Sequence, residues 1–161
     1  MPVIRDVPRV FLAHSCQSDG LVHQFARELK VRSVNPYVAE WDDRPGLTVD
    51  EKTLPELDGA DGVVVFWSES GRASDRVNME YDRALLRGIP IVLLLYDGVD
   101  RPASWGDRIY LRVEISRDFF GRTFVSPITR LRLVERVTKY AFEWLAGANR
   151  RARGTTGPVP V

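Results

Sequence analysis

One glutamate, Glu80, is the side chain best placed to act on a bound molecule. It lies in a segment with helical spacing, 75–87, that follows the apolar run 62–67. If that run is a central strand of a parallel sheet, Glu80 follows its carboxyl end, where open α/β sheets bind ligands. A carboxylate there can stabilise positive charge that develops during a reaction. Spacing alone favours a surface ion pair of Glu80 with Arg76 or Arg83 over a catalytic role, and both interpretations stay open.

The patterns of other common active sites are lacking. The sequence has no Walker-type phosphate loop, no GxGxxG after the first strand, no CxxC and no paired-histidine motif. We therefore expect no metal and no bound cofactor. Cys16 lies two residues from His14, which supports a thiol nucleophile less well than an unreactive loop thiol. The first strand ends without the acidic cluster of a phosphoacceptor domain.

Composition narrows the class of protein. A chain of 161 residues with 44% hydrophobic and 28% charged residues fits one soluble globular domain. The net charge of +1 argues against direct nucleic-acid binding, which needs a concentrated basic face. A single cysteine suits a reducing compartment, and no apolar run is long enough to cross a membrane. The first residues lack the apolar core of a signal peptide, so we expect a cytoplasmic protein without membrane contact.

The hydrophobic pattern alternates strands with helices. This favours a flavodoxin-like three-layer sandwich, with a five-stranded parallel sheet in the order 2-1-3-4-5 and helices on both faces. We expect a single domain over residues 1–148 and a disordered tail over 149–161. The loops after the first and third strands, 14–19 and 68–74, should meet beside the start of the Glu80 helix. Strands are expected over 9–13, 37–39, 62–67, 91–96 and 109–115, and helices over about 19–34, 48–58, 75–87 and 128–145.

Four segments, in this order, carry a family resemblance. The first strand ends in His14-Ser15, the loop 40–46 follows the second strand, the strand 64–68 leads to Ser74 and then to 77–80, and 87–91 precedes the fourth strand. Together they resemble a Toll/interleukin-1 receptor (TIR) domain of the prokaryotic kind. The resemblance covers about residues 8–115.

The resemblance implies two alternative functions. Some TIR domains cleave the bond between nicotinamide and ribose in NAD, which is then a substrate and not a cofactor, and they carry a glutamate where Glu80 stands. They yield ADP-ribose or cyclic ADP-ribose isomers, and bacterial members often act in antiviral defence. Other TIR domains are non-catalytic scaffolds that associate with one another. A third interpretation is another nucleoside-binding protein of this fold, such as an N-glycoside transferase.

The resemblance also assigns roles to loop residues. Ser15 and the following loop amides are candidates to hold phosphate, and Trp41 to stack on adenine or nicotinamide. Ser70 or Ser74 would be the small residue that precedes the glutamate in enzymatic relatives. Arg76 departs from the family, because those relatives commonly carry Trp there.

A contact loop is the last feature that the resemblance implies. The family's loop after the second strand packs against a neighbouring subunit and completes the site on assembly. In this chain that loop contains Asp42, Asp43, Arg44, Pro45 and Gly46. We therefore expect a homo-oligomer, with a separate sensor or effector protein as a further partner.

Overall fold

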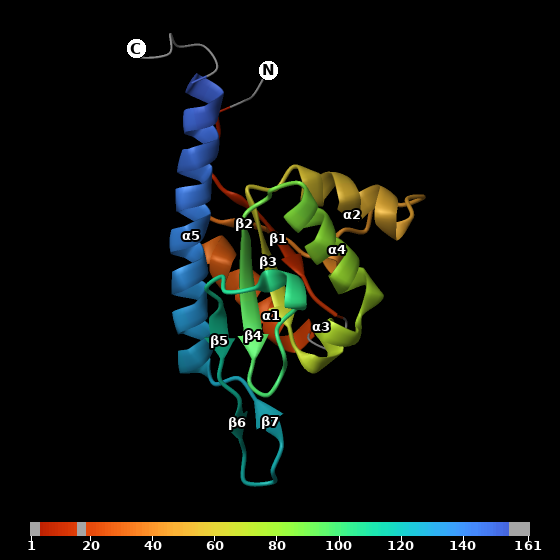
Figure 1. The fold of residues 1–161 in the computed structure, drawn as a ribbon, viewed down its shortest axis with the longest axis vertical. Helices are drawn as coiled ribbons and strands as arrows, with labels where there is room; N and C mark the ends of the chain where they lie inside the picture. The colour runs from red at the N-terminus through yellow and green to blue at the C-terminus, as the bar shows by residue number, and fades with distance from the viewer. Residues whose placement is uncertain (1–3, 16–18, 155–161) are drawn as a thin grey trace.

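A five-stranded parallel sheet forms the centre of the molecule (Figure 1). In this computed structural model, which describes residues 4–15 and 19–154, the strand order is β2-β1-β3-β4-β5. The predicted fold class and strand order are confirmed. The strands are β1 (Arg9–Ala13), β2 (Asn35–Tyr37), β3 (Gly62–Trp67), β4 (Ile91–Tyr96) and β5 (Leu111–Val113).

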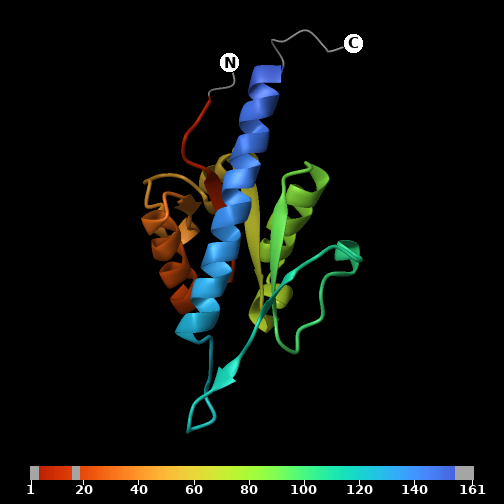
Figure 2. The same ribbon diagram turned by 90° about the vertical axis from the view of Figure 1, so that its left-hand side faces the viewer.

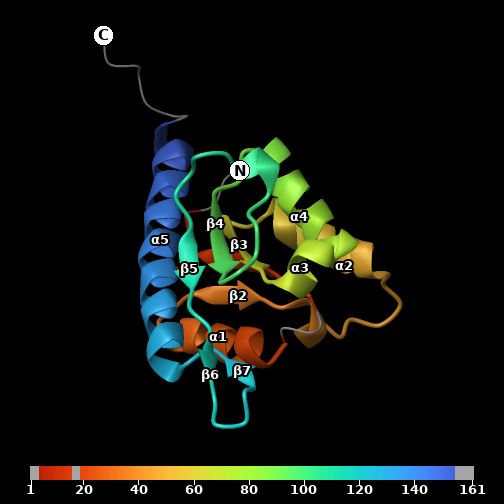
Figure 3. The same ribbon diagram turned by 60° about the horizontal axis from the view of Figure 1, so that its bottom comes forward.

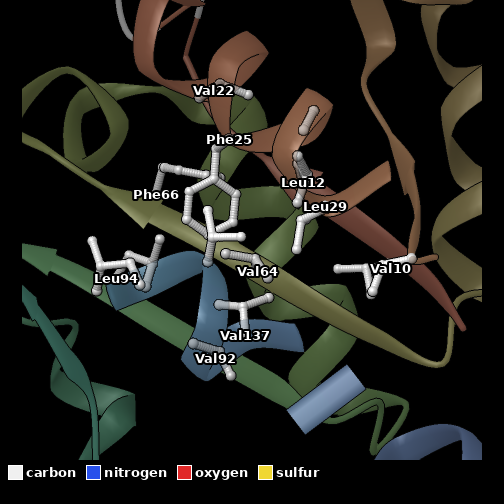
Figure 4. Packing of buried hydrophobic residues seen from close by; sticks show 14 of the residues in the cluster. Val10, Leu12, Val22, Phe25, Leu29, Val64, Phe66, Val92, Leu94 and Val137 are labelled. Carbon is white, nitrogen blue, oxygen red and sulfur yellow. The ribbon is translucent and has the colours of Figure 1, made fainter. Parts of the chain in front are cut away.

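Helices cover both faces of the sheet (Figure 2). Alternate residues of β1 and β3 point to opposite faces, as strand geometry requires. Val10, Leu12, Val64 and Phe66 pack with the apolar sides of α1 (Asp19–Val31) and α5 (Pro127–Gly154), as Figure 4 shows in part. On the other face, the sheet packs with residues of α2 (Val49–Asp58) and α4 (Asp75–Leu86), among them Leu57, Val77 and Tyr81. The core thus holds the carboxyl ends of β1 and β3 side by side.

Two serines start the helices that follow β3. The Ser68 hydroxyl accepts a hydrogen bond from the Gly71 amide and caps α3 (Glu69–Ala73), and the Ser74 hydroxyl accepts one from Val77 and caps α4. Such caps satisfy amides that would otherwise lack a partner at a helix start. The segment 68–74 therefore contains a short helix and is not the predicted loop.

A small hairpin extends from the carboxyl edge of the sheet (Figures 1 and 3). It pairs β6 (Ser116–Arg117) with β7 (Thr123–Phe124) in antiparallel fashion. Phe119 and Phe120 at its tip are exposed. Short 3₁₀ turns occupy Ala39–Trp41 and Ala103–Trp105.

Three predicted boundaries are wrong. The second strand lies at Asn35–Tyr37 and not at 37–39, because Val38 turns into the 3₁₀ segment Ala39–Trp41. Only Leu111–Val113 of the expected edge strand 109–115 pairs with β4. The last helix continues to Gly154, so residues 149–154 are helical and not part of a disordered tail. In the described part of the chain, no helix combines the length and apolar character needed to cross a membrane.

Candidate functional site

Glu80 is buried on the second turn of α4. Its exposed fraction is 3%, close to that of its buried neighbours Val77 and Tyr81 on the same helix. No hydrogen bond or ion pair joins Glu80 to any other residue that the structure describes. Burial of a carboxyl group without such a partner is unfavourable and calls for an explanation.

The surface ion-pair interpretation of Glu80 is wrong. The Arg76 guanidinium pairs instead with Asp50 on α2 at 2.8 Å, and its Nη1 lies 3.4 Å from the Thr53 hydroxyl. Arg83 makes two hydrogen bonds to Asp58, of 2.8 and 2.7 Å. Both arginines therefore tie α4 to α2 and leave Glu80 facing inward.

Burial raises the pKa of Glu80 to about 7. Loss of hydration of the charged form is the largest cause. The positive charges of Arg76 and His14 partly offset it, and the negative charges of Glu40 and Asp50 add to it. Such a carboxyl group exchanges its proton near neutral pH, as candidate catalytic groups often do.

His14, next to the end of β1, lies between two hydrogen-bond acceptors. Its Nδ1 is 3.0 Å from the Leu12 carbonyl oxygen, and its Nε2 is 2.9 Å from both carboxylate oxygens of Glu40. A carbonyl and a carboxylate both accept hydrogen bonds, so this geometry suits an imidazole that donates from both ring nitrogens. The hydrogen bond from His14 is the main reason why the pKa of Glu40 is lowered. His14 therefore brings positive charge toward Glu80.

A cleft of about 590 Å³ opens at this edge of the sheet, and we call it the Glu80 cleft because Arg76, one turn before Glu80 on α4, lines it. Glu80 itself lies behind this wall and is not a lining residue. The walls of the cleft come from the ends of β1 and β2, from the start of α2 and from α3 and α4. The lining residues are His14, Ser15, Ala39, Glu40, Val49, Lys52, Ser70, Ala73, Ser74 and Arg76. Of the predicted substrate-binding residues, Ser15, Ser70 and Ser74 therefore lie together around one cleft.

Three hydroxyl groups form one hydrogen-bonded cluster in the wall of this cleft. The Ser70 hydroxyl is 2.6 Å from that of Ser15 and 3.1 Å from that of Ser68. Ser15 and Ser68 are buried, whereas Ser70 is half-buried and lines the cleft. Hydroxyl groups held in this way can donate to oxygens of a bound molecule.

Trp41 does not line the cleft. Its ring packs against His23 at 5.5 Å between centroids, and the Lys30 ammonium group lies 4.9 Å from its centre. The predicted stacking partner of a nucleotide base is thus occupied by side chains of α1. Cys16, the candidate thiol, lies outside the described residues.

The loop after β2 is hydrogen-bonded at Asp42 and is exposed beyond it. Asp42 accepts hydrogen bonds from the Tyr37 hydroxyl and from Arg44, and these bonds keep its pKa well below the usual range. Residues 43–50 are exposed throughout. The segment that should contact a neighbour is therefore accessible.

Glu40 and Lys52 also line the cleft, and neither was among the predicted substrate-binding residues. The position of Glu40 at the cleft could have been predicted, because it follows the second strand and the carboxyl ends of parallel strands lie at one edge of the sheet. The position of Lys52 could not, since its Nζ reaches the cleft from α2 by donating to the carbonyl oxygens of Ala39 and Asp42. Within the described residues, no cluster of three or more His, Cys, Asp or Glu side chains fits a metal ion.

Comparison with known families gives a match over most of this structure. A family model described as TIR domain matches residues 10–124, which span all five strands of the sheet and the Glu80 cleft. The chain belongs to the TIR domain family.

A solved TIR domain shares the fold. It is that of the Toll-related receptor TRR-2 from the lower metazoan Hydra magnipapillata, with a TM-score of 0.58 and 16% sequence identity. The similarity covers 64% of this TIR domain and 82% of the Hydra chain. At this identity the likeness concerns the fold alone. No curated protein matches the sequence closely enough to count as a relative.

Proposed function

We propose that this TIR domain cleaves the bond between nicotinamide and ribose in NAD, with Glu80 as the catalytic carboxylate. The observation that carries the proposal is a buried glutamate without an ionic partner among the described residues, beside a cleft at the carboxyl edge of the sheet. Open α/β sheets bind ligands at this edge. A group that is costly to bury and titrates near neutral pH fits a catalytic role better than a structural one.

The chemistry needs little more than one carboxylate. Nicotinamide joined to ribose is already a cation, so it leaves with the bonding electron pair and needs no general acid. The ribose then resembles an oxocarbenium ion, whose positive charge Glu80 stabilises. A water oxygen bonds to the same carbon and loses a proton, which yields ADP-ribose, nicotinamide and one proton. Attack by a nucleophile of the same molecule gives a cyclic product instead.

Cations and hydroxyl groups of the cleft suit the rest of the substrate. The basic residues His14, Lys52 and Arg76 outnumber the one acidic lining residue, Glu40, so a diphosphate is favoured there. Ser70 is the hydroxyl of the cluster that is placed to donate to it. The TIR family membership supports a role in signalling, which we place in bacterial antiviral defence with a separate sensor or effector protein as partner.

Release of free nicotinamide tests this proposal. The purified chain is incubated with NAD at high protein concentration, with and without a crowding agent. Glu80→Gln keeps the size of the side chain and removes its charge, so release should fall at least about 100-fold. Glu51→Gln, at an exposed position on α2, is the matched control and should keep its activity. Release that survives in Glu80→Gln would exclude Glu80 as the catalytic group.

A scaffold function is the second candidate, and the exposure of residues 43–50 favours it. That stretch presents Leu47 and Val49 to solvent, 41% and 46% exposed. TIR domains interact with one another, and such a loop provides a contact surface. Self-association without nicotinamide release under any assembly condition would support the scaffold over the enzyme.

A further inference from the structure

A second cavity lies beside the Glu80 cleft. It has a volume of about 600 Å³, within the range of small-molecule sites. Its walls come from the start of α1, the end of β4 and the β6–β7 hairpin, which Figure 3 shows next to one another. The residues that matter here are Leu21, Gln24, Ser70, Tyr96, Thr123 and Phe124. Nothing in the chemistry at Glu80 uses this space.

The lining combines apolar walls with a few polar groups. Leu21, Phe124 and their apolar neighbours provide surfaces for a flat ring, and Gln24 provides an amide that can donate and accept. The Tyr96 hydroxyl is buried and has no hydrogen-bond partner among the described residues. The cavity therefore suits a planar heterocycle with polar edges.

Charge separates the two cavities. The second one has Glu69 as its single charged lining residue and no cation among the described residues that line it. The Glu80 cleft is lined by three basic residues, His14, Lys52 and Arg76, and by one acidic residue, Glu40. Phosphate is thus favoured in the cleft and disfavoured in the second cavity, which fits an uncharged base and sugar.

Ser70 lines both cavities. Its hydroxyl is hydrogen-bonded to that of Ser15, which lines the cleft, and to that of Ser68, which lines the second cavity. A molecule that reaches from one cavity to the other passes this cluster of hydroxyl groups. An elongated ligand with a ring at each end and phosphates between them has the shape and charge that this arrangement requires.

We propose that the second cavity holds the adenosine half of NAD while the nicotinamide riboside lies at Glu80. This inference rests on the proposed function. It assigns Tyr96, Thr123 and Phe124 to substrate binding, and it makes the β6–β7 hairpin part of the site.

Kinetics with NAD and with nicotinamide mononucleotide, which lacks the adenosine half, test the assignment. Thr123→Trp fills the cavity from an exposed strand position, so KM for NAD should rise at least about tenfold, with kcat within about twofold. Cleavage of nicotinamide mononucleotide should not change. The control Arg122→Trp places the same indole ring next to Thr123 but outside the lining, and it should behave like the unmodified chain.

Adenosine monophosphate gives a readout that does not need catalysis. Titration followed by NMR should show binding to the unmodified chain and to Arg122→Trp, and loss of binding in Thr123→Trp. If no NAD cleavage occurs but this pattern holds, the proposed function fails and the nucleotide site stands. An unchanged KM for NAD in Thr123→Trp, equal effects on both substrates, or absence of adenosine monophosphate binding would each overturn the assignment.

Discussion

At the scale of single residues, Glu80 shows how helix position and neighbouring pairs determine the state of a carboxyl group. It shares the buried side of α4 with Val77 and Tyr81. The arginines at positions 76 and 83, which could neutralise it on the surface, pair with carboxylates of α2 instead. The fold thus keeps Glu80 dehydrated next to a cleft, and the consequences can be measured as a function of pH.

Nicotinamide release should depend on pH around the pKa of Glu80. The reaction needs the carboxylate, and burial raises the pKa to about 7, so kcat/KM should rise about tenfold per pH unit below 7 and level off above it. The positive charge of Arg76 lowers this pKa, so Arg76→Gln should move the midpoint to higher pH. Initial rates between pH 5.5 and 9 measure both. A flat profile over this range would contradict the role of Glu80.

The free energy of unfolding should also depend on pH through Glu80, and the contribution of this group should fall as pH rises. The pKa of Glu80 rises from 4.5 to about 7 on folding, so its favourable contribution is present below pH 4.5 and is lost as pH rises through 7. Because Glu80→Gln does not titrate, its free energy of unfolding relative to the unmodified chain should increase by up to about 3 kcal/mol between pH 4.5 and 8. Urea denaturation of both proteins at several pH values measures this. The same substitution at the exposed Glu51 should show no such change.

The sequence predicted part of this site and could not predict the rest. The position of Glu80 after the third strand followed from hydrophobic spacing, and strand order brought Ser15 and Ser70 to the same edge. The burial of Glu80 did not follow, because it depends on Asp50 and Asp58 of α2 taking the arginines. The position of Trp41 outside the cleft did not follow either, because its contacts with His23 and Lys30 depend on the packing of α1.

At the scale of elements, the turn from β3 into α3 and α4 sets the walls of both cavities. Gly71 is buried there, and a Cβ atom on it would lie 2.4 Å from the Phe66 carbonyl oxygen. Backbone therefore fills the space that any side chain would need. Ser68 and Ser74 are suitable helix caps, but the segment that they bound was predicted to be a loop and not the helix α3.

Gly71→Ala should destabilise the protein and disturb the cleft. Moving the backbone to relieve the contact with Phe66 should cost about 1–3 kcal/mol of unfolding free energy, and it should displace Ser70, which adjoins Gly71. Gly154→Ala at the end of α5 is the control, because a Cβ atom there meets nothing within 4 Å. Denaturation curves and nicotinamide release measure the two effects. Equal stability of the two variants would show that the turn adapts without cost.

At the scale of the whole molecule, the exposed loop that contains residues 43–50 lies next to the cleft at the carboxyl edge of the sheet. The loop follows η2 (Ala39–Trp41) and leads into α2, and residues of both segments line the cleft. Packing of a second copy against the loop would therefore act directly on the walls of the proposed site. Hydrophobic patterning predicted the sheet order on which this proximity depends, but the contacts of the loop come from tertiary packing.

Pro45→Asp should weaken self-association and reduce nicotinamide release. It places a charge in the middle of the exposed segment, where a partner surface would have to dehydrate it. Ile109→Asp, at an 84% exposed position next to β5 at the opposite edge of the sheet, is the control. Sedimentation together with specific activity over a range of protein concentrations measures both. Activity of Pro45→Asp equal to that of the control at high concentration would separate this loop from assembly.

The two ends of the described chain are joined by hydrogen bonds. The Arg5 backbone amide donates to the Asn149 side chain at 3.3 Å, and the Asn149 side chain donates to the Arg5 carbonyl oxygen at 2.9 Å. Arg5 also pairs with Asp61 just before β3, at the amino edge of the sheet and away from both cavities. A short linker between these ends can therefore produce circular permutants with new ends at the β6–β7 turn. Immobilisation through Arg5 or through the end of α5 near Asn149 would hold the protein on a surface with its cleft facing the solution (Figure 1).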